Sequence, residues 1–167
     1  KEKKLNFNIK NFSKFKDKIN YIVVEDLPLN LKTFKKNWQI NHLRDQHQRN
    51  ALSRGYLDSN DEDLIMISDI DEIPNPKKID EFNFKNKYAC FIQKNFQSKI
   101  NLQNISDKNW MGTKIIKKKY LKSPQWLRNI KDRSYPIWRF DIFFSNNKYF
   151  NIKTIEDGGW HFSYLKT

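Results

Sequence analysis

A run of four apolar residues, Leu64–Ile67, has acidic residues on both sides and is followed closely by Pro74 and Pro76. A continuous apolar run of this length is typical of a strand that is covered on both faces. Proline cannot donate to a strand ladder, so the two prolines end this extended segment. The sequence therefore predicts a short, buried, central strand, with Asp69 and Asp71 directly after it.

The preceding segments suggest how this strand is packed. Residues 18–26 form a β-branched run closed by Leu27 and Pro28, which predicts a second buried strand. Residues 34–56 contain no proline and carry apolar residues at helical spacing, so we expect a helix that ends near Gly55. Strand, helix and strand in this order predict a parallel α/β sheet.

The rest of the chain is expected to consist of strands and loops, in one α/β domain over residues 1–167 without internal repeats. Pro76 could open a short helix through Phe82. The expected later strands cover residues 88–96, 113–116, 137–144 and 160–165.

The charge balance is strongly basic, with 32 Lys and Arg against 19 Asp and Glu and a formal net charge of +13. Such an excess points to an anionic partner, but a genome-wide bias towards Lys, Asn and Ile explains it equally well. Only six of the basic residues are Arg, and no nucleic-acid fingerprint is present, so no nucleic-acid partner is expected. The basic stretch from Lys114 to Arg133 is either a solvated face or an anion-facing rim.

The single cysteine, Cys90, excludes an internal disulfide and a zinc site built from several thiolates. A reducing compartment is the default expectation. No run of about 18 apolar residues exists, so no transmembrane segment is expected. We therefore expect a cytoplasmic protein, or one that lies peripherally at a membrane.

The acids are concentrated around the predicted central strand, with six of the 19 between Asp61 and Glu72. In open α/β sheets, ligands bind beyond the carboxyl ends of the strands, where Asp69 and Asp71 would lie. Crowded carboxylates repel one another unless a cation neutralises them, and Mg²⁺ or Mn²⁺ commonly binds one or two carboxylates plus substrate phosphates. Asp61 and Asp63 have the same spacing but precede the strand. The sequence therefore predicts Asp69 and Asp71 as the metal ligands.

Two motifs carry a resemblance. Residues 68–74 (SDIDEIP) and 158–164 (GGWHFSY) resemble glycosyltransferase family 17, which includes the β-1,4-mannosyl-glycoprotein β-1,4-N-acetylglucosaminyltransferases. Asp45 and Arg49 match an acid and an arginine that the family carries before its acidic strand, and Lys4 is a weaker match near its start. The resemblance runs over essentially the whole chain.

The resemblance implies a GT-A-type, Rossmann-like fold, a nucleotide-sugar donor, a divalent metal and inversion at the anomeric carbon. A UDP-sugar, N-acetylglucosamine in particular, and a glycan acceptor are favoured. The family's first nucleotide-binding strand should lie upstream of Lys1, and its sequence continues past Thr167. The expected domain is therefore truncated at both ends.

The donor side of the site is expected to use the metal pair and the helix. A metal between the diphosphate and Asp71, with Asp69 binding the metal, its water or the ribose, would stabilise the charge of the leaving group. Arg49 could reach the donor's sugar or phosphate, with Asp45 beside it. The two residues could equally form an ion pair at i and i+4.

The catalytic candidates are Glu72, Asp157 and His161. Glu72 could act as a base or orient the acceptor, or instead cap backbone amides. Asp157, beside two glycines, is one candidate for the general base. His161 could bind metal or acceptor, or be a hydrogen-bonded core residue.

Trp160 and Trp110 could stack on sugar faces, although core packing is the more frequent role of tryptophan in strands. Of the two tryptophans, Trp160 is the one expected to bind the donor.

Two other functions compete with glycosyl transfer. The strand that ends in Asp69-Ile70-Asp71 also fits a phosphatase of the haloacid dehalogenase type, in which the first Asp is the nucleophile. That class has a later acidic pair at a strand end, and this sequence has no Asp-Asp pair after Asp71. A non-enzymatic basic module that binds nucleic acid is the second alternative, and its binding should weaken steeply with salt.

Overall fold

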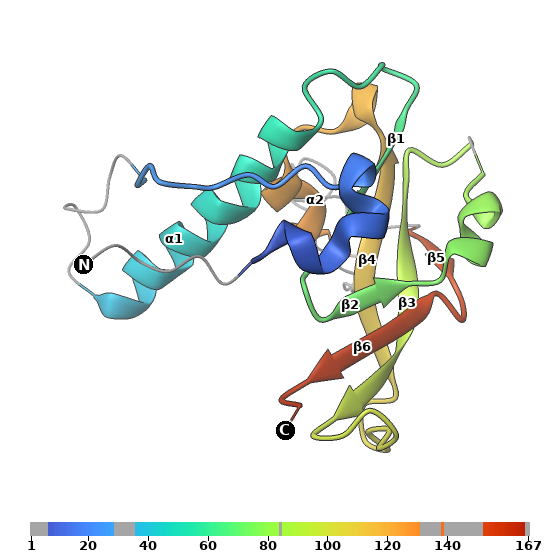
Figure 1. The fold of residues 1–167 in the computed structure, drawn as a ribbon. Helices are drawn as coiled ribbons and strands as arrows, with labels where there is room; N and C mark the ends of the chain where they lie inside the picture. The colour runs from blue at the N-terminus through green and yellow to red at the C-terminus, as the bar shows by residue number, and fades with distance from the viewer. Residues whose placement is uncertain (1–6, 29–35, 84, 131–137, 139–151, 166–167) are drawn as a thin grey trace. The chain divides into compact units, whose positions relative to one another are not determined.

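The computed structural model describes residues 7–28, 36–83, 85–130, 138 and 152–165 (Figure 1). The chain divides into two compact units, Lys1–Leu57 and Asp58–Thr167, and each is described by itself.

The described residues of the first unit form three helical elements: η1 (Ile9–Lys18), α1 (Asn37–Asn50) and η3 (Ala51–Gly55). The helix expected before Gly55 is confirmed over its described part, where α1 continues into a 3₁₀ turn that ends at that glycine. The strand expected over residues 18–26 is wrong. Lys18 ends η1, and residues 20–28 have no regular structure. Among the described residues of this unit there is no strand with which the β-branched run could pair, and a strand is stabilised mainly by such pairing.

Asp26 anchors the irregular segment of the first unit. Arg54 donates two hydrogen bonds to the Asp26 carboxylate, from Nη1 over 2.8 Å and from Nη2 over 2.6 Å. His47 Nε2 lies 3.0 Å from the same carboxylate. The hydrogen bonds from Arg54 hold the pKa of Asp26 well below its ordinary value. The segment is therefore tied to α1 and η3 by charge rather than by a strand ladder.

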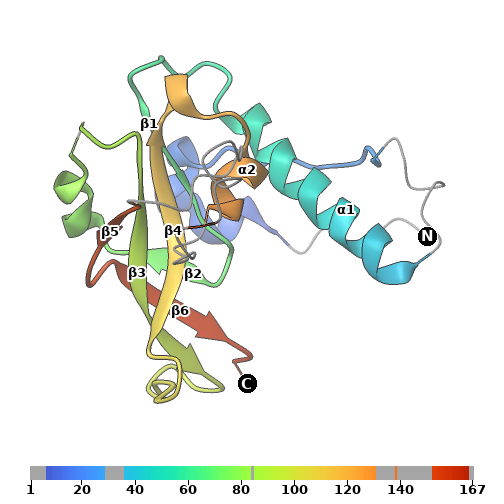
Figure 2. The ribbon, with the colours of Figure 1, turned by 180° about the vertical axis from the view of Figure 1, so that it is seen from behind.

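The second unit contains a six-stranded sheet. Its strands are β1 (Leu64–Ile67), β2 (Glu72–Pro74), β3 (Tyr88–Gln97), β4 (Asn109–Lys117), β5 (Lys153–Ile155) and β6 (Gly159–Ser163). The helical elements within the described part of this unit are η4 (Pro76–Glu81), η5 (Lys118–Tyr120) and α2 (Pro124–Asn129). The strand order is β1-β4-β3-β6-β2, with β5 paired to β3. The long strands β3 and β4 lie side by side in both views of the chain (Figures 1 and 2).

The sheet is mixed rather than parallel, which corrects the sequence-based expectation. β1 pairs with β4, β3 with β4 and β2 with β6 in antiparallel fashion, and only β5 and β6 run parallel to β3. The parallel partner expected for β1 was the segment over residues 18–26, which is not a strand. The expected strand-helix-strand unit around β1 therefore does not form. The α/β class is confirmed only in this general sense.

β1 occupies the predicted residues but not the predicted place. It lies at one end of the strand order, with Leu64 exposed and with Ile65 and Ile67 buried. Among the strands that the structure describes, the apolar run is therefore at an edge and not central. One-sided burial of a four-residue run cannot be distinguished from two-sided burial by composition alone.

The other expected elements fare better. The strands expected over residues 88–96 and 113–116 are confirmed within β3 and β4, and the helix opened by Pro76 is a 3₁₀ helix. The strand expected over 160–165 corresponds to β6, which begins one residue earlier and ends at Ser163. The strand expected over 137–144 lies outside the described residues, apart from residue 138.

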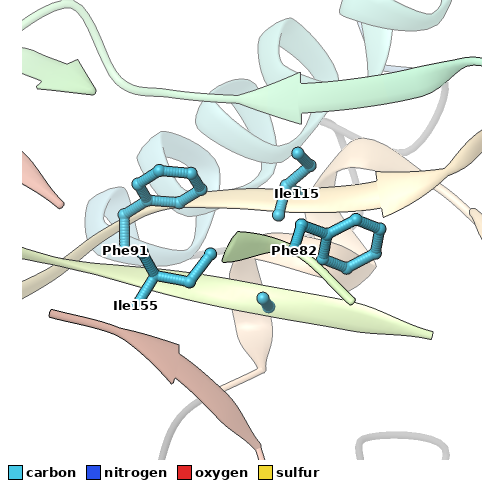
Figure 3. Close-up of a cluster of buried hydrophobic side chains, with 5 residues drawn as sticks. Phe82, Phe91, Ile115 and Ile155 are labelled. Atoms are coloured by element: carbon cyan, nitrogen blue, oxygen red, sulfur yellow. The ribbon is translucent and has the colours of Figure 1, made fainter. Parts of the chain in front are cut away.

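A compact apolar cluster holds β3, β4, β5 and the end of η4 together (Figure 3). Phe91, Ile115 and Ile155 are fully buried, and Phe82 packs against them from the end of η4. Truncating a buried Phe to Ala typically costs about 3–5 kcal/mol. This cluster is one apolar support of the sheet that carries the candidate site.

The sheet is curled, so its two ends approach the same central strands. β2, at the far end of the strand order from β1, also contacts β3 and β4. Residues 68–71, which join β1 to β2, therefore cross from one end of the sheet to the other. The acidic motif lies on this crossing.

Candidate functional site

The acidic crossing is a tight turn fixed by backbone hydrogen bonds. Glu72 N donates to Asp69 O over 3.0 Å, and the side chain of Ile70 is fully exposed at the tip. Phe162 N of β6 donates to Asp71 O over 2.9 Å. The turn therefore presents Asp69 and Asp71 on either side of an exposed apolar residue.

Glu72 is buried and accepts four hydrogen bonds. Its Oε1 accepts from Trp110 Nε1 over 2.9 Å and from Arg128 Nη2 over 2.8 Å. Its Oε2 accepts from Arg128 Nη1 over 2.9 Å and from Asp69 N over 3.2 Å. The bond from Asp69 N is the amide cap that was one of the two roles expected for Glu72. A carboxylate so enclosed is suited to holding its neighbours in place, and its role as a base stays a prediction.

Arg128, near the end of α2, is the cation of this turn. Besides Glu72, its Nη2 donates to Asp69 Oδ2 over 2.8 Å and its Nη1 to Gly112 O over 2.8 Å. The Arg128 side chain is only 9% exposed. Burial alone would lower the pKa of Arg128, but the hydrogen bonds and charges of Glu72 and Asp69 raise it above its ordinary value. Arg128 therefore supplies part of the positive charge that was expected to neutralise the crowded carboxylates.

The two candidate metal ligands turn to different partners. The Asp69 carboxylate is bonded to Arg128, whereas the Asp71 carboxylate lies next to His161, with Oδ2 3.5 Å from Nε2. The Asp71 side chain remains 43% exposed. Coordination by both aspartates stays a prediction, and the geometry favours Asp71 together with His161.

His161 is held in β6 by a defined set of neighbours. Its ring stacks on that of Trp110, with centroids 4.2 Å apart and planes 8° from parallel. Register places His161 beside Glu72 of β2 on one side and Asn95 of β3 on the other. The His161 side chain is 5% exposed. The histidine is therefore both a packed residue and a neighbour of the exposed Asp71.

Asn95 fixes which ring nitrogen of His161 carries hydrogen. Asn95 Nδ2 donates to Asp107 O over 3.0 Å, which assigns its Oδ1 as the acceptor. That Oδ1 lies 3.0 Å from His161 Nδ1, so Nδ1–H is the donor. In the neutral ring, Nε2 then carries a lone pair.

The lone pair on Nε2 and the Asp71 carboxylate form an unfavourable pair of acceptors. Ser163 Oγ lies 3.4 Å from Nε2 and can donate to this lone pair. Oδ2 of Asp71, 3.5 Å from Nε2, is a second acceptor at the same place, and a proton or a metal ion between the two atoms would relieve their repulsion. Carboxylate oxygen suits Mn²⁺, imidazole nitrogen suits Zn²⁺ and similar ions, and bonds to Zn²⁺ are about 2.0–2.2 Å long. The spacing is therefore suitable for two ligands of one ion.

A series of hydrogen-bonded polar side chains connects the start of the turn to β4 and β3. Ser68 Oγ lies 2.6 Å from Thr113 Oγ1, and Gln93 Nε2 donates to Thr113 Oγ1 over 3.1 Å. Gln93 Oε1 is buried without a hydrogen-bond partner among the described residues. A Cβ at Gly112 would lie 1.9 Å from this oxygen, so the close approach of Gln93 requires glycine there.

The remaining expected site residues lie elsewhere. Trp160 is 39% exposed and pairs with Ile73 of β2. Because neighbouring residues of a strand point to opposite faces, Trp160 faces away from His161. Asp157 lies in the turn before β6, exposed, with Lys94 Nζ 3.6 Å from its carboxylate. Asp45 and Arg49 lie one turn apart on α1, in the first unit. The roles predicted for these four residues stay predictions.

The basic stretch is largely engaged within the second unit. Lys117 and Lys119 both bond Glu62, and Lys118 bonds the carbonyl of Ser59. Lys114 is buried and donates to Arg128 O over 2.5 Å. Lys131 and Arg133 lie outside the described residues. The described lysines of this stretch therefore serve internal contacts more than an anion-facing rim.

The site offers two metal-binding side chains, not a complete cage. Among the residues that the structure describes, no three His, Cys, Asp or Glu side chains gather closely enough to hold an ion by themselves.

No helix within the described part of the chain is long and apolar enough to cross a bilayer.

Comparisons with protein-family models, with curated proteins and with solved structures find no match to this chain. The site is therefore interpreted from its own geometry.

Arg128 and Asn95 are site residues that were not predicted from the sequence. Arg128 is one of several basic residues in its stretch and lies 56 positions from Glu72. Asn95 is only 5% exposed, but it lies in the polar half of β3, beside Gln93, Lys94 and Gln97. The sequence therefore carries no signal that separates the buried Asn95 from exposed polar neighbours such as Lys94 and Gln97.

Proposed function

We propose that this chain is part of a metal-dependent, inverting glycosyltransferase of the GT-A type that transfers a sugar from a nucleotide donor to a glycan acceptor. The observation that supports it most is the facing pair of Asp71 Oδ2 and His161 Nε2, 3.5 Å apart. The two residues come from the two motifs that resemble family 17. A divalent cation, Mn²⁺ or Mg²⁺, would satisfy both acceptors.

The donor set suits such an ion. One carboxylate and one imidazole leave several coordination positions, which waters and a diphosphate can fill. When bound, the ion would neutralise the charge that develops on the departing diphosphate. Asp71 is exposed enough to meet a ligand from solvent, while Asn95 and Trp110 keep the His161 ring oriented. Outer-shell hydrogen bonds of this kind fix a ligand's tautomer.

The transfer itself is a single displacement. The acceptor hydroxyl attacks the anomeric carbon, the bond from that carbon to the diphosphate oxygen breaks, and the hydroxyl proton passes to a carboxylate base. Asp157 remains the candidate base because it is exposed and adjoins β6. Glu72 is the weaker candidate because four donors already occupy its oxygens. A UDP-sugar, with N-acetylglucosamine favoured, is the proposed donor.

The alternative functions have less support from the geometry. A phosphatase nucleophile needs a carboxylate open to attack, whereas Asp69 is ion-paired with Arg128. A nucleic-acid module needs an available basic face, and the stretch from Lys114 to Lys122 offers little of one, because its lysines have internal partners.

The decisive experiment is a titration of the full chain with Mn²⁺, UDP and GDP, each alone and in combination, by calorimetry. We expect nucleoside diphosphate binding that depends on Mn²⁺, and Mn²⁺ binding that is lost in Asp71→Asn and weakened in His161→Gln. Asp80→Asn is the matched control, because Asp80 is an exposed acid on η4 away from the turn. Unchanged Mn²⁺ affinity in Asp71→Asn would contradict the proposal and favour a proton between the two residues.

A further inference from the structure

The start of the chain combines a high density of lysine with aromatic residues. Residues 1–18 contain seven lysines against two acids, so this segment carries a formal +5 of the chain's +13. Phe7, Phe12 and Phe15 are interleaved with these lysines. A solvated basic tail has no need of large apolar side chains.

The described part of this segment keeps its apolar side chains in water. η1 (Ile9–Lys18) buries none of its residues. Phe12 is 45% exposed and Phe15 57%, and Tyr21, just after the helix, is 45% exposed. Large apolar side chains exposed together, with charges around them, mark an interaction surface more often than an ordinary solvent face.

The kinked helix places aromatic residues next to lysines. Side chains three positions apart eclipse one another in a 3₁₀ helix, but the backbone of Phe12 is not helical and a kink there interrupts this repeat. After the kink, Phe15 and Lys18 are three positions apart, and Lys14 and Lys16 flank Phe15. The result is a short element in which exposed aromatic side chains alternate closely with lysines.

We infer that this element, defined by residues 7–18 and Tyr21 and here named the basic aromatic segment, docks on the surface of an anionic phospholipid bilayer. Clusters of four to eight lysines on an amphipathic element are attracted to anionic headgroups. Aromatic side chains enter the interfacial region, where their apolar rings leave water. The proposal concerns a surface contact and is independent of the proposed catalytic function.

The arrangement of the rings favours a bilayer over nucleic acid. Phe7 stacks on Phe12, with centroids 5.4 Å apart, and on Tyr21, with centroids 4.5 Å apart. Base stacking needs ring faces that are available to successive bases, whereas here the faces are partly covered by one another. The segment also contains lysine and no arginine, although arginine is the residue that stacks on bases and forks onto phosphates.

The test is co-sedimentation of the full chain with phosphatidylcholine vesicles that contain or lack phosphatidylserine. We expect binding only to the anionic vesicles, and its loss when salt is raised to about 0.5 M. Lys10, Lys14 and Lys16 changed together to Gln should weaken binding roughly tenfold or more. Phe15→Ser should weaken vesicle binding severalfold without affecting folding, because the Phe15 residue is 57% exposed.

Two matched variants separate the segment from the overall charge. Lys77, Lys85 and Lys99 changed together to Gln remove the same charge from exposed positions in the second unit. Ile105→Ser removes an apolar side chain that is 82% exposed there. We expect both variants to bind the vesicles as the parent chain does.

Several results would overturn the inference. Equal losses in the two lysine triples would show that only net charge matters, and equal binding to both vesicle types would exclude headgroup recognition. Absence of binding to anionic vesicles would reject it directly. A single-stranded oligonucleotide that binds with the same dependence on Lys10, Lys14 and Lys16, while vesicles do not, would assign the segment to nucleic acid instead.

Discussion

Arg128 and Glu72, 56 residues apart in the chain, meet through two parallel hydrogen bonds: Nη1 to Oε2 over 2.9 Å and Nη2 to Oε1 over 2.8 Å. The Glu72 side chain has no exposed surface, and that of Arg128 is 9% exposed. A buried carboxylate depends on such a partner, because its removal leaves an uncompensated charge away from water. This pair ties α2 to the acidic turn that carries Asp71.

Replacing Arg128 should therefore be strongly destabilising. For Arg128→Met we expect a loss of about 3–5 kcal/mol in the free energy of unfolding, measured by urea denaturation. Arg54→Met is the matched control, since Arg54 makes a similar fork to Asp26 but both side chains are exposed. Water screens that pair, so its loss should be much smaller. Equal losses in the two variants would contradict the structural role assigned to Arg128.

Asn95 should control metal affinity through His161. With Asn95→Ala, the His161 ring loses the acceptor that fixes Nδ1–H, and we expect Mn²⁺ affinity to fall about 10- to 100-fold, measured by calorimetry. The double variant with His161→Gln should show no further loss beyond His161→Gln alone. Additive losses in the double variant would mean that Asn95 acts independently of the histidine.

Glu62 should contribute stability that depends on pH. Hydrogen bonds from Lys117 and then Lys119 lower the pKa of Glu62 from 4.5 to about 2. The folded state thus holds Glu62 ionised at pH values where the unfolded chain is protonated, so its contribution is present above pH 4.5 and is lost as the pH falls towards about 2. The stability difference between the parent and Glu62→Gln should shrink across that range in urea titrations. A stability difference between the parent and Glu62→Gln that stays constant with pH would refute the assignment.

Gly159 should tolerate no side chain. Its φ of +131° disfavours L-residues, and an added Cβ would lie 2.1 Å from Ile73 O and 2.9 Å from Asn75 N. We expect Gly159→Ala to disrupt the pairing of β2 with β6 and to lower stability by roughly 1–3 kcal/mol or more. In Gly55→Ala the new Cβ meets only the end of the flexible Ile22 side chain, at 3.2 Å. Thermal unfolding that shifts by the same amount in both variants would contradict this distinction.

The sequence predicted local elements correctly where one residue type, or a run of one type, determines the backbone conformation. Pro76 opens a 3₁₀ helix as expected, Gly55 ends the first long helical stretch, and the apolar runs in β1, β3 and β4 are strands. The prediction failed at residues 18–26 because a β-branched run becomes a strand only beside a partner. The parallel sheet failed for the same reason, since direction depends on which strands meet.

The sequence by itself determined the chemistry that is available: an acidic motif after an apolar strand, a histidine in a second motif, and a basic, aromatic N-terminal segment. Only the tertiary structure decided how these groups are used. It directed Asp69 to Arg128 and Asp71 to His161, and it placed β1 at an edge of a curled, mixed sheet. Charge pairing and metal coordination act over a few ångströms in space, and separations of 56 or 66 residues along the chain, as for Arg128 with Glu72 or His161 with Asn95, carry no periodic signal that composition can reveal.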